Sequence, residues 1–159
     1  MTNLHSFKKV AVHGVPRSGT SWVGEILNSS PNTAYRFQPL FSYAHKAYLD
    51  NTSTKEDIAQ FFSRLRNCDD DFTNQKAKRN SGDFPQFRKQ KITHVIYKEV
   101  RYLNILFNLM RKTEDVLLIS VIRNPLSVIN SWLRAPREFR RDLGWSEIEE
   151  WRYALKKNL

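Results

Sequence analysis

The sequence has little cysteine, few acidic residues and no long apolar run. Among its 159 residues the only cysteine is Cys68, which excludes an internal disulfide and makes a reducing, cytoplasmic environment the expectation. No apolar run is long enough to cross a bilayer, and the N-terminus lacks the pattern of a signal peptide. Metal-ligand spacing of His, Cys, Asp or Glu is also lacking, so we expect no metal.

The shortage of acidic residues leaves a large positive charge. The chain has 26 Lys and Arg against 16 Asp and Glu, and its formal net charge is +10. Such a surplus favours polyanionic partners: a nucleic acid, an acidic surface or a multiply charged nucleotide. The basic residues are spread along the chain and no nucleic-acid-binding motif accompanies them, so we expect no nucleic acid partner. A nucleic-acid-binding protein remains an alternative on charge alone.

Short apolar segments alternate with segments of helical periodicity. We expect strands at residues 8–13, 35–38, 92–100 and 116–122, and helices at about 19–29, 54–66, 104–112, 125–133 and 147–157. This alternation predicts an α/β fold with a mainly parallel sheet. The strand at 116–122 is apolar on both faces, as a central strand should be. Residues 67–91 are polar without a period, and we expect a solvated surface loop.

Capping boxes and apolar spacing predict how the helices begin and which faces they bury. Ser53 with Glu56, and Ser146 with Glu149, have the spacing of capping boxes. In the first helix the side chains expected to face the sheet are Trp22, Val23, Ile26 and Leu27. In the helix at 54–66 they are Ile58, Phe61, Phe62 and Leu65.

The first strand leads into a glycine-containing turn and then a helix. Gly14 and Gly19 have the spacing of a phosphate-binding P-loop, and a loop over a helix start offers unpaired N–H groups to an anion. A nucleotide triphosphatase needs Lys where this chain has Thr20, and here the cation is Arg17, inside the loop. We therefore expect a phosphate site that does not handle a magnesium-bound triphosphate. A degenerate P-loop kinase is disfavoured, since Asn124 stands where it would need a magnesium-binding Asp.

A second candidate anion site follows the strand at 116–122. Arg123 lies at the carboxyl end of that strand, where ligands bind in open α/β sheets. Its guanidinium is a permanently charged, forked donor suited to a phosphate. Ser131 lies eight residues on, in the next predicted helix, and would add a hydroxyl.

Together the two motifs resemble those of sulfotransferases that use 3′-phosphoadenosine 5′-phosphosulfate (PAPS). The first resembles their 5′-phosphosulfate loop, and the second their 3′-phosphate motif of Arg, Asn-Pro and a Ser at the eighth position. The run Arg-Ser-Gly-Thr-Ser-Trp from Arg17 is closer to the carbohydrate and tyrosylprotein branch. The resemblance implies a P-loop-like three-layer fold, here a single domain over residues 1–159. It also implies in-line sulfuryl transfer from PAPS to a hydroxyl or amine, carbohydrate-like in the first instance, with phenol or tyrosyl acceptors as further possibilities.

The resemblance assigns roles to individual residues. Arg17 would take the place of the family's catalytic Lys at the bridging oxygen and sulfonate, and Arg123 with Ser131 would bind the 3′-phosphate. The 5′-phosphate would be held by backbone N–H groups and two hydroxyls of the following residues: Ser18, Gly19, Thr20, Ser21 and Trp22.

The general base is the open assignment. Related branches have a Glu just after the second strand, where this chain has Gln38, which cannot act as a base. Glu99 is the nearest carboxylate and our candidate catalytic base, although strand alternation favours a side chain that points away from the site. His13 is the second candidate, with a packed histidine as the simpler interpretation.

The chain is also short for the family, whose members usually continue well beyond the 3′-phosphate motif. It is therefore interpreted as a truncated or shortened member. The alternative function is a non-catalytic module that binds a nucleotide or polyanion on a degenerate P-loop fold.

Overall fold

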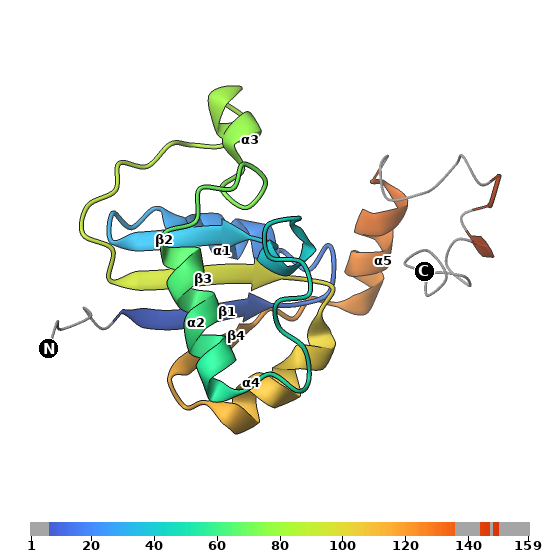
Figure 1. Ribbon diagram of the computed structural model, residues 1–159. Coiled ribbons are helices and arrows are strands. Elements are labelled where there is room, and N and C mark those ends of the chain that lie inside the picture. Colours follow the sequence, from blue (N-terminus) through green and yellow to red (C-terminus); the bar gives the residue numbers. More distant parts are fainter. Residues whose placement is uncertain (1–6, 136–143, 147, 150–159) are drawn as a thin grey trace, which may run out of the picture. The chain divides into compact units, whose positions relative to one another are not determined.

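A four-stranded parallel sheet forms the centre of the protein (Figure 1). The computed structural model describes residues 7–135, 144–146 and 148–149. The strands, in spatial order β2-β3-β1-β4, are β1 (Lys8–His13), β2 (Thr33–Phe37), β3 (His94–Glu99) and β4 (Val116–Ser120). In register, His13 at the end of β1 lies beside Glu99 on β3 and Ser120 on β4.

Helices connect the strands, as expected for parallel pairs. They are α1 (Thr20–Asn28), α2 (Lys55–Arg66), α3 (Lys76–Asn80), α4 (Leu106–Lys112) and α5 (Pro125–Leu133), with 3₁₀ turns η1 (Pro39–Phe41) and η2 (Leu103–Ile105). The chain divides into two compact units, residues 1–122 and residues 123–159. The sheet and the elements up to β4 belong to the first unit, and α5 to the second.

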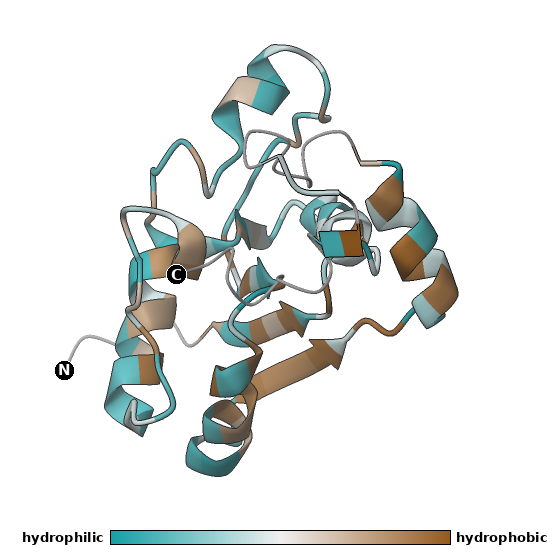
Figure 2. Ribbon diagram, turned by 90° about the vertical axis from the view of Figure 1, so that its right-hand side faces the viewer, coloured by the Kyte–Doolittle hydropathy of each residue, from teal (hydrophilic) through white to brown (hydrophobic). Residues whose placement is uncertain are grey.

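Two apolar clusters lie on the two faces of the sheet. Alternation along β1 sends Val10 and Val12 to the cluster that includes Val23 and Leu27 of α1, and Ala11 to the other. The second cluster contains residues from α2, α4 and η2, including all four predicted α2 positions: Ile58, Phe61, Phe62 and Leu65. Figure 2 shows the strands mostly in the hydrophobic colour, whereas the helices carry both kinds of residue. The α/β class, the parallel sheet and the flanking helices are confirmed.

Three local predictions are corrected by the structure. The capping box of α2 is formed by Thr54 and Asp57, one residue later than predicted, with Asp57 N donating to Thr54 Oγ1 at 3.1 Å and Thr54 N to Asp57 Oδ2 at 2.8 Å. Trp22 and Ile26 are 72% and 50% exposed, so they do not face the sheet. The reason is Gly24, whose missing side chain lets the Tyr35 ring approach α1 closely, which turns a different stripe inward.

The third correction concerns β4, predicted to be a central strand. Among the strands that the structure describes it lies at an edge, and Leu117 is 62% exposed. The capping box of Ser146 and Glu149 is confirmed: Glu149 N donates to Ser146 Oγ and Ser146 N to Glu149 Oε2. The helix predicted at 147–157 falls mainly on residues outside those described.

The segment at 67–91 is more than a solvated loop. It contains α3, and it runs along the outer edge of β2, where Phe37 N donates to Thr73 O at 2.8 Å. Further on, Gln90 N donates to Pro31 O at 2.8 Å. These contacts bring polar residues of the segment beside β2 and the end of α1.

Candidate functional site

The phosphate loop, residues 14–19, joins the carboxyl end of β1 to α1. A side chain at Gly14 would meet Val121 O at 2.6 Å and Ser18 Oγ at 2.7 Å, so only glycine fits this close approach. Gly19 has φ 104°, in the left-handed region that glycine adopts without strain, and it is the N-cap of α1. Glycine is therefore required for a steric reason at position 14 and for a conformational reason at position 19.

Arg17 occupies a strained position in the loop. Its φ of 68° lies in the left-handed region, which costs a non-glycine residue about 1 kcal/mol or more. Arg17 is exposed. Its guanidinium therefore lies at an exposed position of the loop.

The start of α1 has several N–H groups and no side-chain cap. The first intrahelical bond runs from Val23 N to Gly19 O at 3.1 Å, so the N–H groups of Gly19, Thr20, Ser21 and Trp22 precede it. No acidic residue lies in the first turn of α1. Together with the helix dipole, these donors favour an anion.

Ser18 differs from the neighbouring loop residues. Its N–H donates to Val15 O at 3.1 Å, which closes the turn. Its hydroxyl oxygen is buried with no hydrogen-bond partner in the described structure. Ser18 therefore offers a hydroxyl, rather than its N–H, to a ligand of the loop.

His13, at the end of β1, is packed. It is 1% exposed, a 3.0 Å hydrogen bond joins its Nε2 to the Tyr97 hydroxyl, and the two rings meet edge to face. Burial lowers the pKa of His13 to about 4, so the imidazole is neutral at pH 7. With that pKa it is a weak base.

Glu99 lies beside His13 on the same face of the sheet, opposite the face that α1 covers. It is fully buried; Oε1 accepts from Val100 N at 3.2 Å, and Oε2 has no hydrogen-bond partner in the described structure. Burial raises the pKa of Glu99 to about 7. It outweighs the opposing effects of the Val100 and Leu40 N–H groups and of the Lys98 and Arg101 charges. The carboxyl therefore changes its protonation state near neutral pH.

Arg123 and Ser131 belong to the second unit. Arg123 is exposed and immediately precedes Asn124, whose side chain caps α5 by accepting from Leu126 N at 2.9 Å and Ser127 N at 3.3 Å. Ser131 is half-buried on α5. Pro125 at the first helical position completes the predicted helix start. The structure brings the phosphate loop, His13 and Glu99 together in the first unit, and the part of Arg123 and Ser131 in the same site stays a prediction.

The sequence did not reveal a set of basic residues that the fold gathers beside β2. Arg36 on β2, Arg66 on α2, and Arg79 and Lys89 in the segment 67–91 line one cavity. They share no spacing, so only the tertiary structure identifies them.

Comparison with known families agrees with the geometry of the loop. A glycine-containing loop that joins the carboxyl end of a parallel strand to a helix is typical of a P-loop-like α/β protein. The family model described as "Sulfotransferase domain" matches residues 7–155, nearly the whole chain. The chain therefore belongs to the sulfotransferase family, and sulfuryl transfer is the chemistry that this membership supports. No curated protein matches the chain.

Within the described residues, no three His, Cys, Asp or Glu side chains gather as metal ligands would. The helices described at 20–133 include none with the length and apolar character that a bilayer crossing requires.

Proposed function

We propose that this protein transfers a sulfuryl group from PAPS to a hydroxyl or amine of a carbohydrate-like acceptor, as a single domain of the carbohydrate and tyrosylprotein branch. The observation that carries the proposal is the uncapped start of α1 beneath a loop that closes around Gly14. Family membership supplies the reaction class, and the motifs at Arg17 and Arg123 support PAPS as the donor.

The loop residues fit an anionic phosphosulfate. Among the described residues, the buried Ser18 hydroxyl has no hydrogen-bond partner. The N-cap of α1 carries no side-chain hydrogen bond, and the first turn of this helix has no acidic residue. An anion at this place would accept hydrogen bonds from groups that otherwise stay unsatisfied.

Each proposed residue has one task. The N–H groups of Gly19 to Trp22, with the hydroxyls of Ser18, Thr20 and Ser21, hold the 5′-phosphate. Arg123 and Ser131 hold the 3′-phosphate, which selects PAPS. Bound PAPS supplies the activated sulfuryl group. Arg17 stabilises negative charge on the departing phosphate side but does not donate a proton, since a guanidinium stays charged.

Glu99 is the proposed base. Its pKa near 7 suits removal of a proton from the acceptor at neutral pH. Because its carboxyl is buried, the acceptor must reach Oε2 at the strand ends. If Glu99 acts as the base, Glu99→Gln removes the limb of the pH–rate profile near pH 7.

Thermal stabilisation by ligands tests the donor assignment. 3′,5′-Adenosine bisphosphate at about a hundred times its Kd should add about 2.7 kcal/mol of stability, and AMP or ATP with magnesium should add less. Arg123→Ala should abolish the preference for the bisphosphate over AMP. Arg134→Ala, an exposed arginine just after α5, is the matched control and should keep it. An equal response to all three nucleotides would contradict the proposal.

A second candidate is a binding module without catalysis. It is favoured by Gln38 after β2 and by the full burial of Glu99, which leave the base without ready access. Sulfuryl transfer to a panel of sugars, phenols and tyrosyl peptides separates the two. Selective bisphosphate binding without transfer to any acceptor would favour the module.

A further inference from the structure

A cavity of about 440 Å³ opens beside β2, within the first unit. It lies between the C-terminal ends of α1 and α2, the strand β2, and the segment from residue 69 to residue 92. Asn28, in its wall, is the last residue of α1, about 12 Å along the helix from the phosphate loop. The volume falls in the range of about 300–1,000 Å³ that small-molecule sites occupy.

The wall of this cavity is strongly basic, and we call it the basic cavity. Arg36, Arg66, Lys76, Arg79 and Lys89 line it, whereas its one acidic lining residue is Asp69. Lys76 is paired with Asp69 at 3.1 Å and with Asp71 at 2.8 Å, and Arg79 Nη2 with Glu25 Oε1 at 2.7 Å. Three of the five cations remain: Arg36, Arg66 and Lys89. The hydrogen-bond and ring partners described for them are not carboxylates, although Asp69 acts on Arg36 and Glu25 on Lys89 through their charges.

Arg36 is held by backbone carbonyls. Its Nε donates to Leu65 O at 2.7 Å, Nη1 to Tyr35 O at 3.0 Å and Nη2 to Arg66 O at 3.1 Å. These bonds fix the guanidinium against the last turn of α2 without neutralising its charge. Burial lowers the pKa of Arg36, although the group stays charged.

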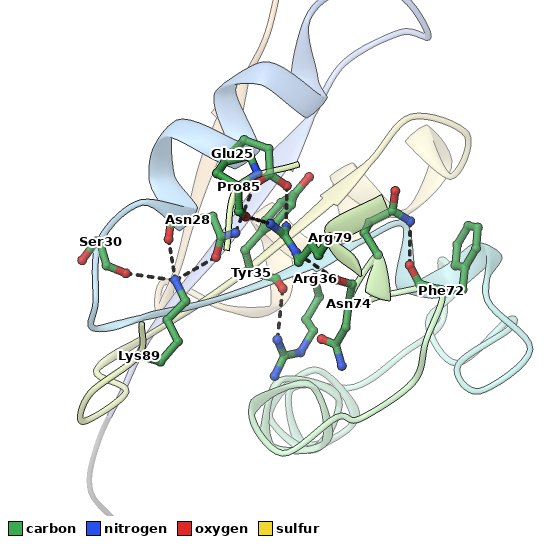
Figure 3. Close-up of polar contacts among 11 residues, drawn as sticks. Glu25, Asn28, Ser30, Tyr35, Arg36, Phe72, Asn74, Arg79, Pro85 and Lys89 are labelled. Carbon is green, nitrogen blue, oxygen red and sulfur yellow. Dashed lines mark hydrogen bonds and ion pairs between the residues drawn. The ribbon is translucent and has the colours of Figure 1, made fainter. Parts of the chain in front are cut away.

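Lys89 is held in the same way (Figure 3). Its ammonium donates to the carbonyl of Asn28, to Asn28 Oδ1 at 2.8 Å and to Ser30 O at 3.1 Å. Burial first, and then the charge of Arg79, lower the pKa of Lys89. An anion bound in the cavity would offset this repulsion.

The neutral part of the wall matches a sugar. Four side-chain amides line the cavity: Asn28, Asn74, Asn80 and Gln86. The NH₂ groups of Asn28, Asn74 and Gln86 already donate within the protein, and Asn28 Oδ1 accepts from Lys89. Within the described structure, the oxygens of Asn74, Asn80 and Gln86 are therefore the acceptors left for sugar hydroxyls. The Phe87 ring adds an apolar face. Inorganic sulfate would use the cations, but it has no proton to donate to these oxygens and would not cover the ring.

We propose that the basic cavity binds an acidic saccharide, one or two sugar units bearing sulfate or carboxylate, at the end of α1 opposite the phosphate loop. The site is separate from the donor loop and would hold a charged segment of a glycan. The proposal goes beyond the transfer reaction, because binding here requires neither PAPS nor a general base.

The test is calorimetric titration of the full chain with a sulfated disaccharide. The comparison ligands are the same disaccharide without sulfate, the same disaccharide with a uronate carboxylate as its only charge, and inorganic sulfate. We expect the two acidic disaccharides to bind more tightly than the other two ligands. Saturating 3′,5′-adenosine bisphosphate should leave this affinity unchanged, which distinguishes a failure here from a failure of the donor assignment.

Matched pairs of variants locate the site. Arg66→Gln should weaken binding of the sulfated disaccharide about tenfold, while Arg64→Gln, on the same turn of α2 but outside the cavity, should not. Lys89→Gln should act like Arg66→Gln, with Lys91→Gln as its control. Arg66 is the primary probe because its described side-chain contact is only the Phe7 ring, at 5.3 Å, so the fold should persist.

Three results would overturn the proposal. They are the absence of binding, equal affinity for the uncharged disaccharide or inorganic sulfate, and equal losses in the Arg66 and Arg64 variants. Competition by the bisphosphate would also overturn it, since the ligand would then occupy the donor loop.

Discussion

The two anion sites proposed here lie at the two ends of α1 and differ in kind. At its N-terminus the phosphate loop offers mostly backbone N–H groups from consecutive residues, with one arginine at the tip. At its C-terminus the basic cavity offers side chains from four segments of the chain. The loop has its cation exposed and strained, whereas Arg36 in the cavity is fixed by three carbonyls.

This difference suits the loop to the transfer reaction and the basic cavity to ligand recognition. Backbone N–H groups at a helix start are held in fixed positions. They can therefore stabilise a small transferred group, such as a sulfuryl group, in one geometry. Side chains around an open cavity recognise the outline and charge of a larger ligand. If both assignments hold, changes in the loop alter the rate, and changes in the cavity alter affinity for the glycan.

Among the variants that separate the two sites, Arg17→Ala is expected to have the largest effect, on the rate of sulfuryl transfer. Removal of a cation at the reacting group should lower kcat for sulfuryl transfer about 100- to 1,000-fold. Arg17→Lys should recover part of the rate, and both variants should bind the sulfated disaccharide like the parent. Full activity in Arg17→Ala would remove the loop from the chemistry.

The next effect concerns how the buried residues His13 and Glu99 make the free energy of unfolding depend on pH. Between pH 4.5 and 7 the folded state holds a proton on Glu99 that the unfolded state has lost, so this group makes stability fall as pH rises. His13 acts in the opposite direction between pH 4 and 6.5, because only the unfolded state is protonated there. The two contributions oppose each other, each up to about 3 kcal/mol.

Single variants should reveal the two slopes. Glu99→Gln should make the free energy of unfolding rise with pH from 4.5 to 6.5, and His13→Gln should make it fall over the same range. Urea denaturation at a series of pH values measures both. Parallel curves for the two variants would show that these groups do not titrate as described.

A smaller effect is expected from Gly14→Ala, which tests the shape of the loop. The added methyl would meet Val121 O and Ser18 Oγ, so we expect a loss of about 1–3 kcal/mol of stability and weaker bisphosphate binding. Binding at the basic cavity should be unchanged. Unaltered bisphosphate affinity would mean that the close approach at Gly14 does not shape the anion site.

The smallest effect provides a reference away from both sites. Thr54→Ala removes the α2 cap and should cost about 1 kcal/mol of unfolding free energy, measured by thermal or urea denaturation. Glu56→Ala, which belonged to the capping box predicted from sequence, should change stability little. A larger loss of stability in Glu56→Ala than in Thr54→Ala would support the capping box predicted from the sequence.

The sequence predicted the loop well because its signals are local. The boundaries of β1, the glycine positions and the buried face of α2 follow from spacing within a dozen residues. The place of β4 in the sheet could not be read this way, because apolar alternation does not say which strands pair. The exposure of Trp22 was missed for a similar reason: it depends on Tyr35 packing against Gly24.

The basic cavity was beyond sequence reasoning for a further reason. Arg36 and Lys89 are separated by more than fifty residues, and only the parallel sheet and the segment along β2 bring them together. In the sequence, the same residues contributed only to the net charge. The general base has the same difficulty, since the burial that raises the pKa of Glu99 comes from elements on both sides of it in the chain.

The two outer strands of the described sheet differ in how their outer edges are covered. β2 has the segment of residues 67–91 along its rim, whereas β4 is the outermost described strand on the other side, with Leu117 62% exposed. The outer edge of a strand presents backbone N–H and C=O groups that can form hydrogen bonds with another extended chain. Purified samples are therefore expected to self-associate through β4 as concentration increases, and a charged residue at Leu117 is the simplest way to keep them monomeric.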